Sequence, residues 1–202
     1  MSKISEIYTN ESFVVQLKAK LLYYFGLFIL VVITAITLKD LIVVHQTGLG
    51  LYLLSMIIMA SAVFAGLYML HKGNYRIAAM IMTISLTLGL LAGFFGKLSS
   101  DEPYNAFTGY AYYFTAILVL TALFSNRSVL IINTLIFVIG EIIYFQLLKG
   151  KFTPEVNSMI GNAVEDCAIG LILTGAMSLG ILSLNKRAII LAEQEAGKNK
   201  EQ

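Results

Sequence analysis

The chain has few residues that carry reactive chemistry. It contains one cysteine, two histidines and two prolines among 202 residues. The single cysteine, Cys167, allows neither a disulfide framework nor a cysteine-based metal site. The two histidines, His45 and His71, stand at opposite ends of one apolar stretch and are 26 residues apart. In a helix this separation corresponds to about 39 Å, so the two imidazoles cannot share a haem iron or another metal.

Several catalytic patterns are also missing. A retinal Schiff base requires a lysine in the middle of a membrane span, whereas Lys39 and Lys97 stand at the ends of apolar stretches, where long side chains reach the interface. No apolar stretch offers the buried base that an intramembrane serine protease needs, and no phosphate-binding loop is present. We therefore expect no enzymatic activity, no catalytic residue, no cofactor and no metal.

Charge is scarce and unevenly distributed. Charged residues make up 13% of the chain and hydrophobic residues 58%, whereas ordinary globular proteins carry about 25% charged residues. The net charge of +2 gives no support for a nucleic-acid partner. The charges lie between long uncharged stretches, each close to the roughly 20 residues that a helix needs to cross the hydrocarbon core. These stretches are residues 21–38, 51–70, 77–96, 107–124, 129–147 and 159–184.

Continuous apolar runs without a period-two alternation favour helices over barrel strands. The predicted fold is all-α, a polytopic bundle of six transmembrane helices solvated by the lipid bilayer. We divide the chain into an N-terminal segment (1–20), a six-helix transmembrane domain (21–184) and a connector helix (185–202). Residues 1–20 carry both acidic and basic residues and do not resemble a cleaved secretory signal.

The basic residues predict the orientation. Six spans place both termini on one side, and the Lys and Arg residues in loops mark the cytoplasmic side. Ten of the 14 basic residues, including every arginine, fall on the side of the termini. We therefore expect cytoplasmic N and C termini. The short connections 71–76 and 125–128 on this side make the helices that flank them antiparallel neighbours, whereas both prolines lie in the longer outer loops.

Small residues recur at four-residue spacing within the apolar stretches and allow helices to pack closely. The pairs are Ser61 with Ala65, Ala62 with Gly66, Gly89 with Gly93, and Ala176 with Gly180. We expect most of them to pack the bundle. Ala176 and Gly180 are also candidates for contact with a second protomer, because they lie on the last span.

Three acidic residues interrupt the last two spans. Glu141 stands about two turns from the outer end of the fifth span, and Glu165 and Asp166 stand about two turns into the sixth. A carboxylate at the centre of a membrane helix costs about 2.5–3.5 kcal/mol on insertion scales, so such a group usually faces the bundle interior. The residues expected at a similar height that can join these three acids in an outward-opening pocket are Asp40, Tyr110, Tyr112, Tyr113 and Asn162.

The predicted pocket has two functional interpretations and one structural one. It can bind a small cationic or polar ligand, or its carboxyl groups can act as a proton-titratable switch. In the structural interpretation, Glu165 and Asp166 lie among lipid headgroups and the tyrosines form an interfacial aromatic belt. Glu141 then makes one hydrogen bond between helices.

The last span continues into a polar tail rich in helix-forming residues. Leu184, Ala188 and Leu191 have the four-and-three spacing of a short coiled-coil seam; a frayed amphipathic helix is the alternative. This layout resembles the six-helix N-terminal sensor modules of bacterial receptors such as chemoreceptors, nucleotide cyclases and histidine kinases. The resemblance rests on six spans, the short turns at 73–76 and 125–127, nearly absent soluble loops, and a last span that runs into Asn185-Lys186-Arg187. The tail at 192–202 is similar to the connector helices of spirochaete-type receptors.

The resemblance implies a multi-pass protein of the bacterial cytoplasmic (inner) membrane. It also implies a parallel homodimer through the sixth span and connector helix, and a cytoplasmic effector beyond residue 202. The chain would pass a ligand or membrane signal through its last helix. Two other functions stay open: a small secondary transporter built from two groups of three spans, and a structural subunit of a membrane complex.

Overall fold

The computed structural model describes residues 3–43, 49–99 and 103–198 of the chain, which form seven α-helices and one short 3-10 helix. A short helix, α1 (Lys3–Ile7), precedes the long α2 (Phe13–Val43). The remaining helices are α3 (Leu49–His71), α4 (Tyr75–Gly96), the 3-10 turn η1 (Lys97–Ser99), α5 (Asn105–Phe124), α6 (Arg127–Leu148) and α7 (Pro154–Lys198). The described residues contain no strand, which confirms the predicted all-α class.

Six of the helices in the described part of the chain, α2 to α7, are long and apolar enough to cross a membrane. Their outer surfaces are apolar: Phe28, Val31 and Met177 are 63%, 67% and 70% exposed. Exposed apolar surface of this extent indicates a protein that is solvated by lipid. The described residues thus have the makeup of a multi-pass membrane protein, as the six uncharged stretches predicted.

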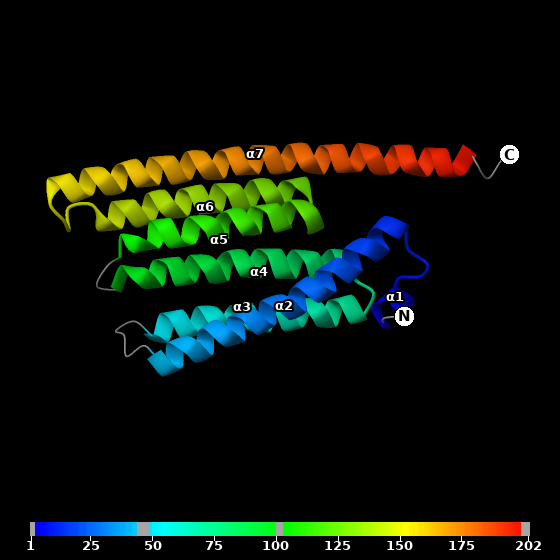
Figure 1. Ribbon diagram of the computed structural model, residues 1–202, viewed down its shortest axis with the longest axis horizontal. Coiled ribbons are helices and arrows are strands. Elements are labelled where there is room, and N and C mark those ends of the chain that lie inside the picture. The colour runs from blue at the N-terminus through cyan, green and yellow to red at the C-terminus, as the bar shows by residue number, and fades with distance from the viewer. Residues whose placement is uncertain (1–2, 44–48, 100–102, 199–202) are drawn as a thin grey trace.

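The helices form two groups of three that meet at α4. The first group comprises α2, α3 and α4, and the second comprises α5, α6 and α7, with α4 packed against α5 and α6 (Figure 1). Half of the apolar window of α4 is buried inside the protein, compared with 17% for α2 and for α7. Helix α4 is therefore the centre of the bundle, and α2 and α7 are its outer walls.

Close packing in the first group depends on glycine. A Cβ atom added to Gly89 on α4 would overlap the side chain of Met59 on α3, and one added to Gly66 on α3 would overlap Met82 on α4. The predicted small-residue pairs that contain Gly66 and Gly89 thus lie at a helix contact. The last pair does not: Ala176 is exposed, and a Cβ on Gly180 would meet open space.

Two tight turns connect antiparallel neighbours, as their length predicted. Gly73 between α3 and α4 has a φ of +79°, a left-handed conformation that favours glycine. Between α5 and α6, the side chain of Asn126 accepts a hydrogen bond of 3.0 Å from the backbone N–H of Val129. This bond caps the first turn of α6.

Helix α7 is a single helix of 45 residues, about 67 Å long at 1.5 Å per residue. Its C-terminal part extends beyond the ends of α5 and α6, and both chain termini lie at this end of the bundle (Figure 1). Residue 185, where we expected the membrane domain to end and the connector to begin, therefore lies within one continuous helix. The predicted coiled-coil seam falls partly outside the described residues, since the side chains of Ala188 and Leu191 belong to the part that is not described.

Candidate functional site around Glu141

Glu141 lies in the middle of the inward face of α6. The buried residues of this helix recur every three or four positions, which is the spacing of one helical face. They are Val129, Leu130, Asn133, Phe137, Gly140, Glu141, Tyr144 and Leu148. The Glu141 side chain is 0% exposed, and neither of its carboxylate oxygens has a hydrogen-bond partner in the described structure. Most buried polar groups have a hydrogen-bond partner, and the Glu141 carboxyl group has none in the described structure.

Stacked aromatic rings lie one turn above and one turn below this carboxyl group. Phe137 stacks on Phe114 of α5 with ring centroids 4.2 Å apart, and Tyr144 stacks on Phe94 of α4 at 4.1 Å. The rings shield Glu141 from water along the helix axis. An ionised carboxylate without a hydrogen bond or a counter-ion is costly in such surroundings.

Tyr144 also ties α6 to the segment before α5. Its hydroxyl donates a hydrogen bond of 2.8 Å to the carbonyl oxygen of Pro103. This bond satisfies the phenol in the core, because the Tyr144 side chain is 0% exposed. The Tyr144 hydroxyl therefore donates its hydrogen bond to the Pro103 carbonyl oxygen and does not pair with the Glu141 carboxyl group.

Helix α7 closes the site from the other side. Gly161 packs near the Phe145 ring, with Thr134 beside Gly175 three to four turns away, so the two antiparallel helices place Cys167 level with Glu141. Cys167 is half-buried and directs its Sγ toward the Phe107 carbonyl oxygen of α5, 4.0 Å away.

Among the other residues predicted to line a pocket, Tyr110 joins the aromatic cluster beside Glu141. Its ring is half-buried, 5.4 Å from Phe94 and 5.9 Å from Phe114. Tyr113 contacts Tyr110 edge-on at 5.9 Å but is 52% exposed, and Tyr112 is 79% exposed. The structure brings Tyr110 to the site and leaves the other two tyrosines on the surface of α5.

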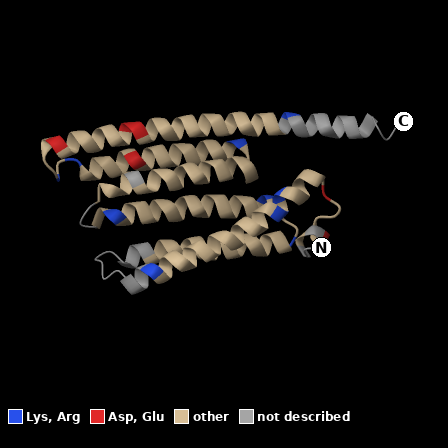
Figure 2. Ribbon diagram, viewed as in Figure 1, with Lys and Arg blue, Asp and Glu red and all other residues tan. Residues whose placement is uncertain are grey.

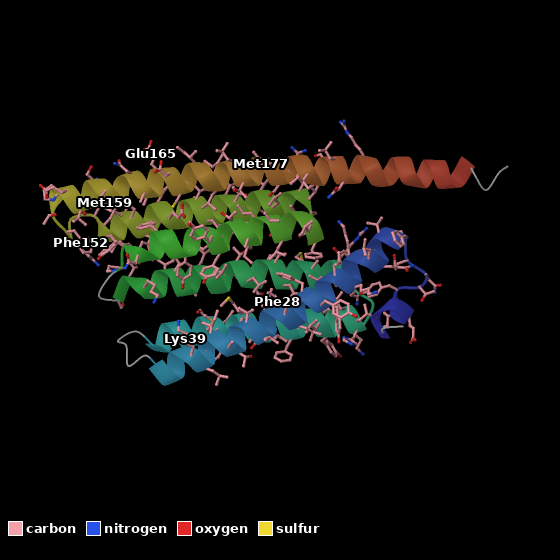
Figure 3. The ribbon with its side chains drawn as sticks, in the orientation of Figure 1. Phe28, Lys39, Phe152, Met159, Glu165 and Met177 are labelled. Carbon is pink, nitrogen blue, oxygen red and sulfur yellow. The ribbon has the colours of Figure 1, made fainter. Side chains whose placement is uncertain are left out.

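The predicted residues of α7 lie on its outer face. Asn162, Glu165 and Asp166 are exposed, and Figure 3 shows Glu165 on the side of α7 away from the bundle. The inward face of this helix is formed by Ile160, Val164, Leu171, Gly175 and Ser178. Asn162 and Asp166 share a face, as their spacing predicted, but it is not the face that meets Glu141. The side chain of Asp40 lies outside the described residues, as does His45.

The acidic residues of α6 and of the first half of α7 lie in the half of the bundle that is farther from the two termini (Figure 2). Glu141 is the buried one among them, and the others face outward. The site is thus a single sealed carboxyl group with aromatic neighbours, and not an open pocket lined by several acids.

An open cleft at the opposite end of the bundle had no signal in the sequence. It has a volume of about 280 Å³ and is lined by Tyr8, Glu11, Val15 and residues 73–77 of the turn before α4. Tyr8 is 1% exposed and donates a hydrogen bond of 3.1 Å to the Leu70 carbonyl oxygen. Burial and, to a lesser extent, the charge of Glu11 raise the pKa of Tyr8 to about 12. Residues 1–20 were expected to be a simple cytoplasmic segment, and nothing in their composition indicated that Tyr8 docks under the bundle.

A second buried polar contact was also missed. The Asn133 side-chain amide donates a hydrogen bond of 3.1 Å to the Thr121 hydroxyl and links α6 to α5. An asparagine within an apolar span is a detectable signal, because such residues usually bond across helices.

Among the described residues, no group of three or more His, Cys, Asp or Glu side chains is placed to hold a metal ion. No family model, no curated protein and no solved structure matches this chain.

Proposed function

We propose that the chain is a membrane-embedded sensory module that passes a signal through α7 to an effector on the cytoplasmic side. The observation that carries this proposal is the continuity of α7. One helix of 45 residues contacts α5 and α6 beside Glu141 and then extends past the end of the bundle. A helix transmits rotation or tilt along its length, so a change in packing beside Glu141 reaches the far end of α7.

The proposal includes the orientation and the assembly expected from the sequence. The excess of basic residues on the side of the termini supports a cytoplasmic location for the protruding part of α7. The exposed face of α7, with Ala176 and Gly180, supports a parallel homodimer in which two such helices meet. Two states of this helix pair that differ in their affinity for the signal are sufficient for a switch.

The test is a set of fusions in which the tail is joined to an adenylate cyclase catalytic domain. Inserting two residues after Lys186 rotates the fused domain by about 200° relative to the bundle, whereas inserting seven changes its phase by only about 20°. We expect the two-residue insertion to change cyclase output strongly and the seven-residue insertion to restore it. Equal output from all three fusions would show that α7 transmits nothing.

A second candidate is a small secondary transporter, which one observation favours. Glu141 and its aromatic neighbours lie where α6 of the second three-helix group meets α4 of the first, and transporters place their coupling sites between such groups. Uptake of a labelled substrate by counterflow in liposomes, lost in Glu141→Gln, would support transport. Absence of counterflow together with phase-dependent cyclase output would favour the sensory function.

A further inference from the structure

We propose that Glu141 is a proton-binding site, and that loss of its proton loosens α7 from α5 and α6. The proton is then the signal of the sensory module. The output depends on the proposed sensory function, whereas proton binding at Glu141 does not. It follows from the space, the charges and the packing around one side chain.

The space around Glu141 admits a proton and excludes larger ligands. Its side chain is fully buried between the Phe137 and Tyr144 rings. On the α4 side, a Cβ atom added to the adjacent Gly140 would lie 2.9 Å from the Leu91 side chain, so the two helices are in close contact. The open cleft described above lies at the other end of the bundle. A proton needs no cavity, and its binding makes the buried carboxyl group neutral.

The charges around Glu141 offer no counter-ion for its ionised form. The titratable groups that face it from the helices packed around it are Tyr144 on α6, Tyr110 on α5 and Cys167 on α7, while Asp166 lies on the outer face of α7. None of them becomes a cation. The nearest lysines are Lys149 on the same helix, eight residues and about 12 Å along the axis, and Lys97 directly after α4, six residues and about 9 Å past the Leu91 contact. Ionised Glu141 is therefore a buried charge without a partner. Either water must enter the bundle to hydrate the carboxylate, or the side chain must move to water.

The packing indicates which helix moves when Glu141 is ionised. Helix α6 is held to α4 by the stack of Tyr144 on Phe94 and to the segment before α5 by the bond to Pro103. Helix α7 packs on α5 and α6 along one face only, and no helix of the described structure covers its other face, so that only 17% of its apolar window is buried. Cys167 is the α7 residue level with Glu141, between the contacts of Gly161 with Phe145 and of Gly175 with Thr134. Outward movement of α7 at Cys167 is thus the least costly way to hydrate the ionised carboxyl group.

The first test is infrared difference spectroscopy of the full chain in lipid nanodiscs during a titration from acidic to alkaline pH. We expect a carbonyl band of a protonated, non-hydrogen-bonded carboxylic acid that persists at neutral pH. The band should be absent from Glu141→Gln and unchanged in Glu155→Gln, a matched change of an exposed acid at the start of α7. Absence of the band in the wild type, or its persistence in folded Glu141→Gln, would overturn the proposal.

The second test uses the single cysteine. Labelling of Cys167 by a membrane-permeant maleimide is measured against pH for the wild type, Glu141→Gln and Glu155→Gln. An uncompensated buried charge favours the opened arrangement of α7 by a factor on the order of 100. We expect labelling of the wild type and of Glu155→Gln to rise above that of Glu141→Gln by up to this factor at alkaline pH. Superimposable profiles for the wild type and Glu141→Gln would refute the movement of α7.

The two proposals fail separately. If the infrared band is lost in Glu141→Gln while the cyclase fusions are insensitive to helix phase, the proton site is supported and the sensory role is refuted. If the fusions respond to phase while no such band exists, the module senses something other than a proton at Glu141.

Discussion

The contact between Gly89 and Met59 makes a quantitative test of how the bundle is packed. Replacing Gly89 by alanine places a methyl group inside the Met59 side chain, which is itself 5% exposed and has little freedom to move. Overpacking of this kind costs about 1–3 kcal/mol, and the better helix propensity of alanine returns about 1 kcal/mol. We expect Gly89→Ala to lower the free energy of unfolding by up to about 2 kcal/mol.

The matched control is Gly109→Ala on α5, because a Cβ atom at Gly109 meets nothing within 4 Å. This change should be neutral or slightly stabilising. A double-mutant cycle identifies the cause: in a Met59→Ala background the space is vacated, so Gly89→Ala should become neutral or stabilising. Unfolding is followed by far-UV circular dichroism as SDS is added to mixed micelles. If Gly89→Ala is as harmless as Gly109→Ala, or if its cost is unchanged without Met59, the close packing of α3 on α4 is refuted.

Three further predictions concern polar contacts. Tyr144→Phe keeps the ring stack but removes the bond to the Pro103 carbonyl, which still accepts from the N–H of Ala106, and should cost about 0.5–1.5 kcal/mol in the same unfolding assay. Asn133→Val and Thr121→Val should be coupled by about 0.6 kcal/mol, the average for hydrogen bonds between membrane helices, and additive costs would argue against their bond. The raised pKa of Tyr8, about 12 against an ordinary 10, means that its docking adds stability below pH 10 that is lost between pH 10 and 12. Protease cleavage of the N-terminal segment should therefore rise over this range in the wild type, with a weaker pH dependence in Tyr8→Phe.

Apolar content predicted the spans well and the helix ends less well. The stretch 77–96 became α4 (Tyr75–Gly96), but the stretch 21–38 is only the middle of α2, which begins at Phe13. Lys18 and Lys20 mark where the apolar run stops, yet both residues favour a helix and do not end one. Helix α7 likewise begins at Pro154 with Glu155 in its first turn, a pattern typical of helix starts that lies outside the apolar stretch.

The position of Glu141 inside the bundle could be expected from the sequence, but the rotation of α7 about its own axis could not. Burial of Glu141 follows from the cost of exposing a carboxylate to lipid, and its neighbours on α6 show a clear inward face. In α7 both faces are apolar between Gly170 and Ile181, so periodicity does not indicate its rotation. The contact of Gly175 with Thr134 sets that rotation, and a contact between distant segments has no signature in a single sequence.

The outward position of the acids on α7 has a consequence for the membrane itself. Between Asp166 and Lys186 the helix carries 19 uncharged residues, an interval of about 28 Å, which is close to the thickness of the hydrocarbon layer. A thicker bilayer would pull one charged end into the acyl chains unless α7 stands more upright, and a thinner one would make it lean. The protruding end of α7 would then change its direction with the tilt of the helix. The lipid composition of the host membrane thus sets the tilt that α7 has in the absence of a signal.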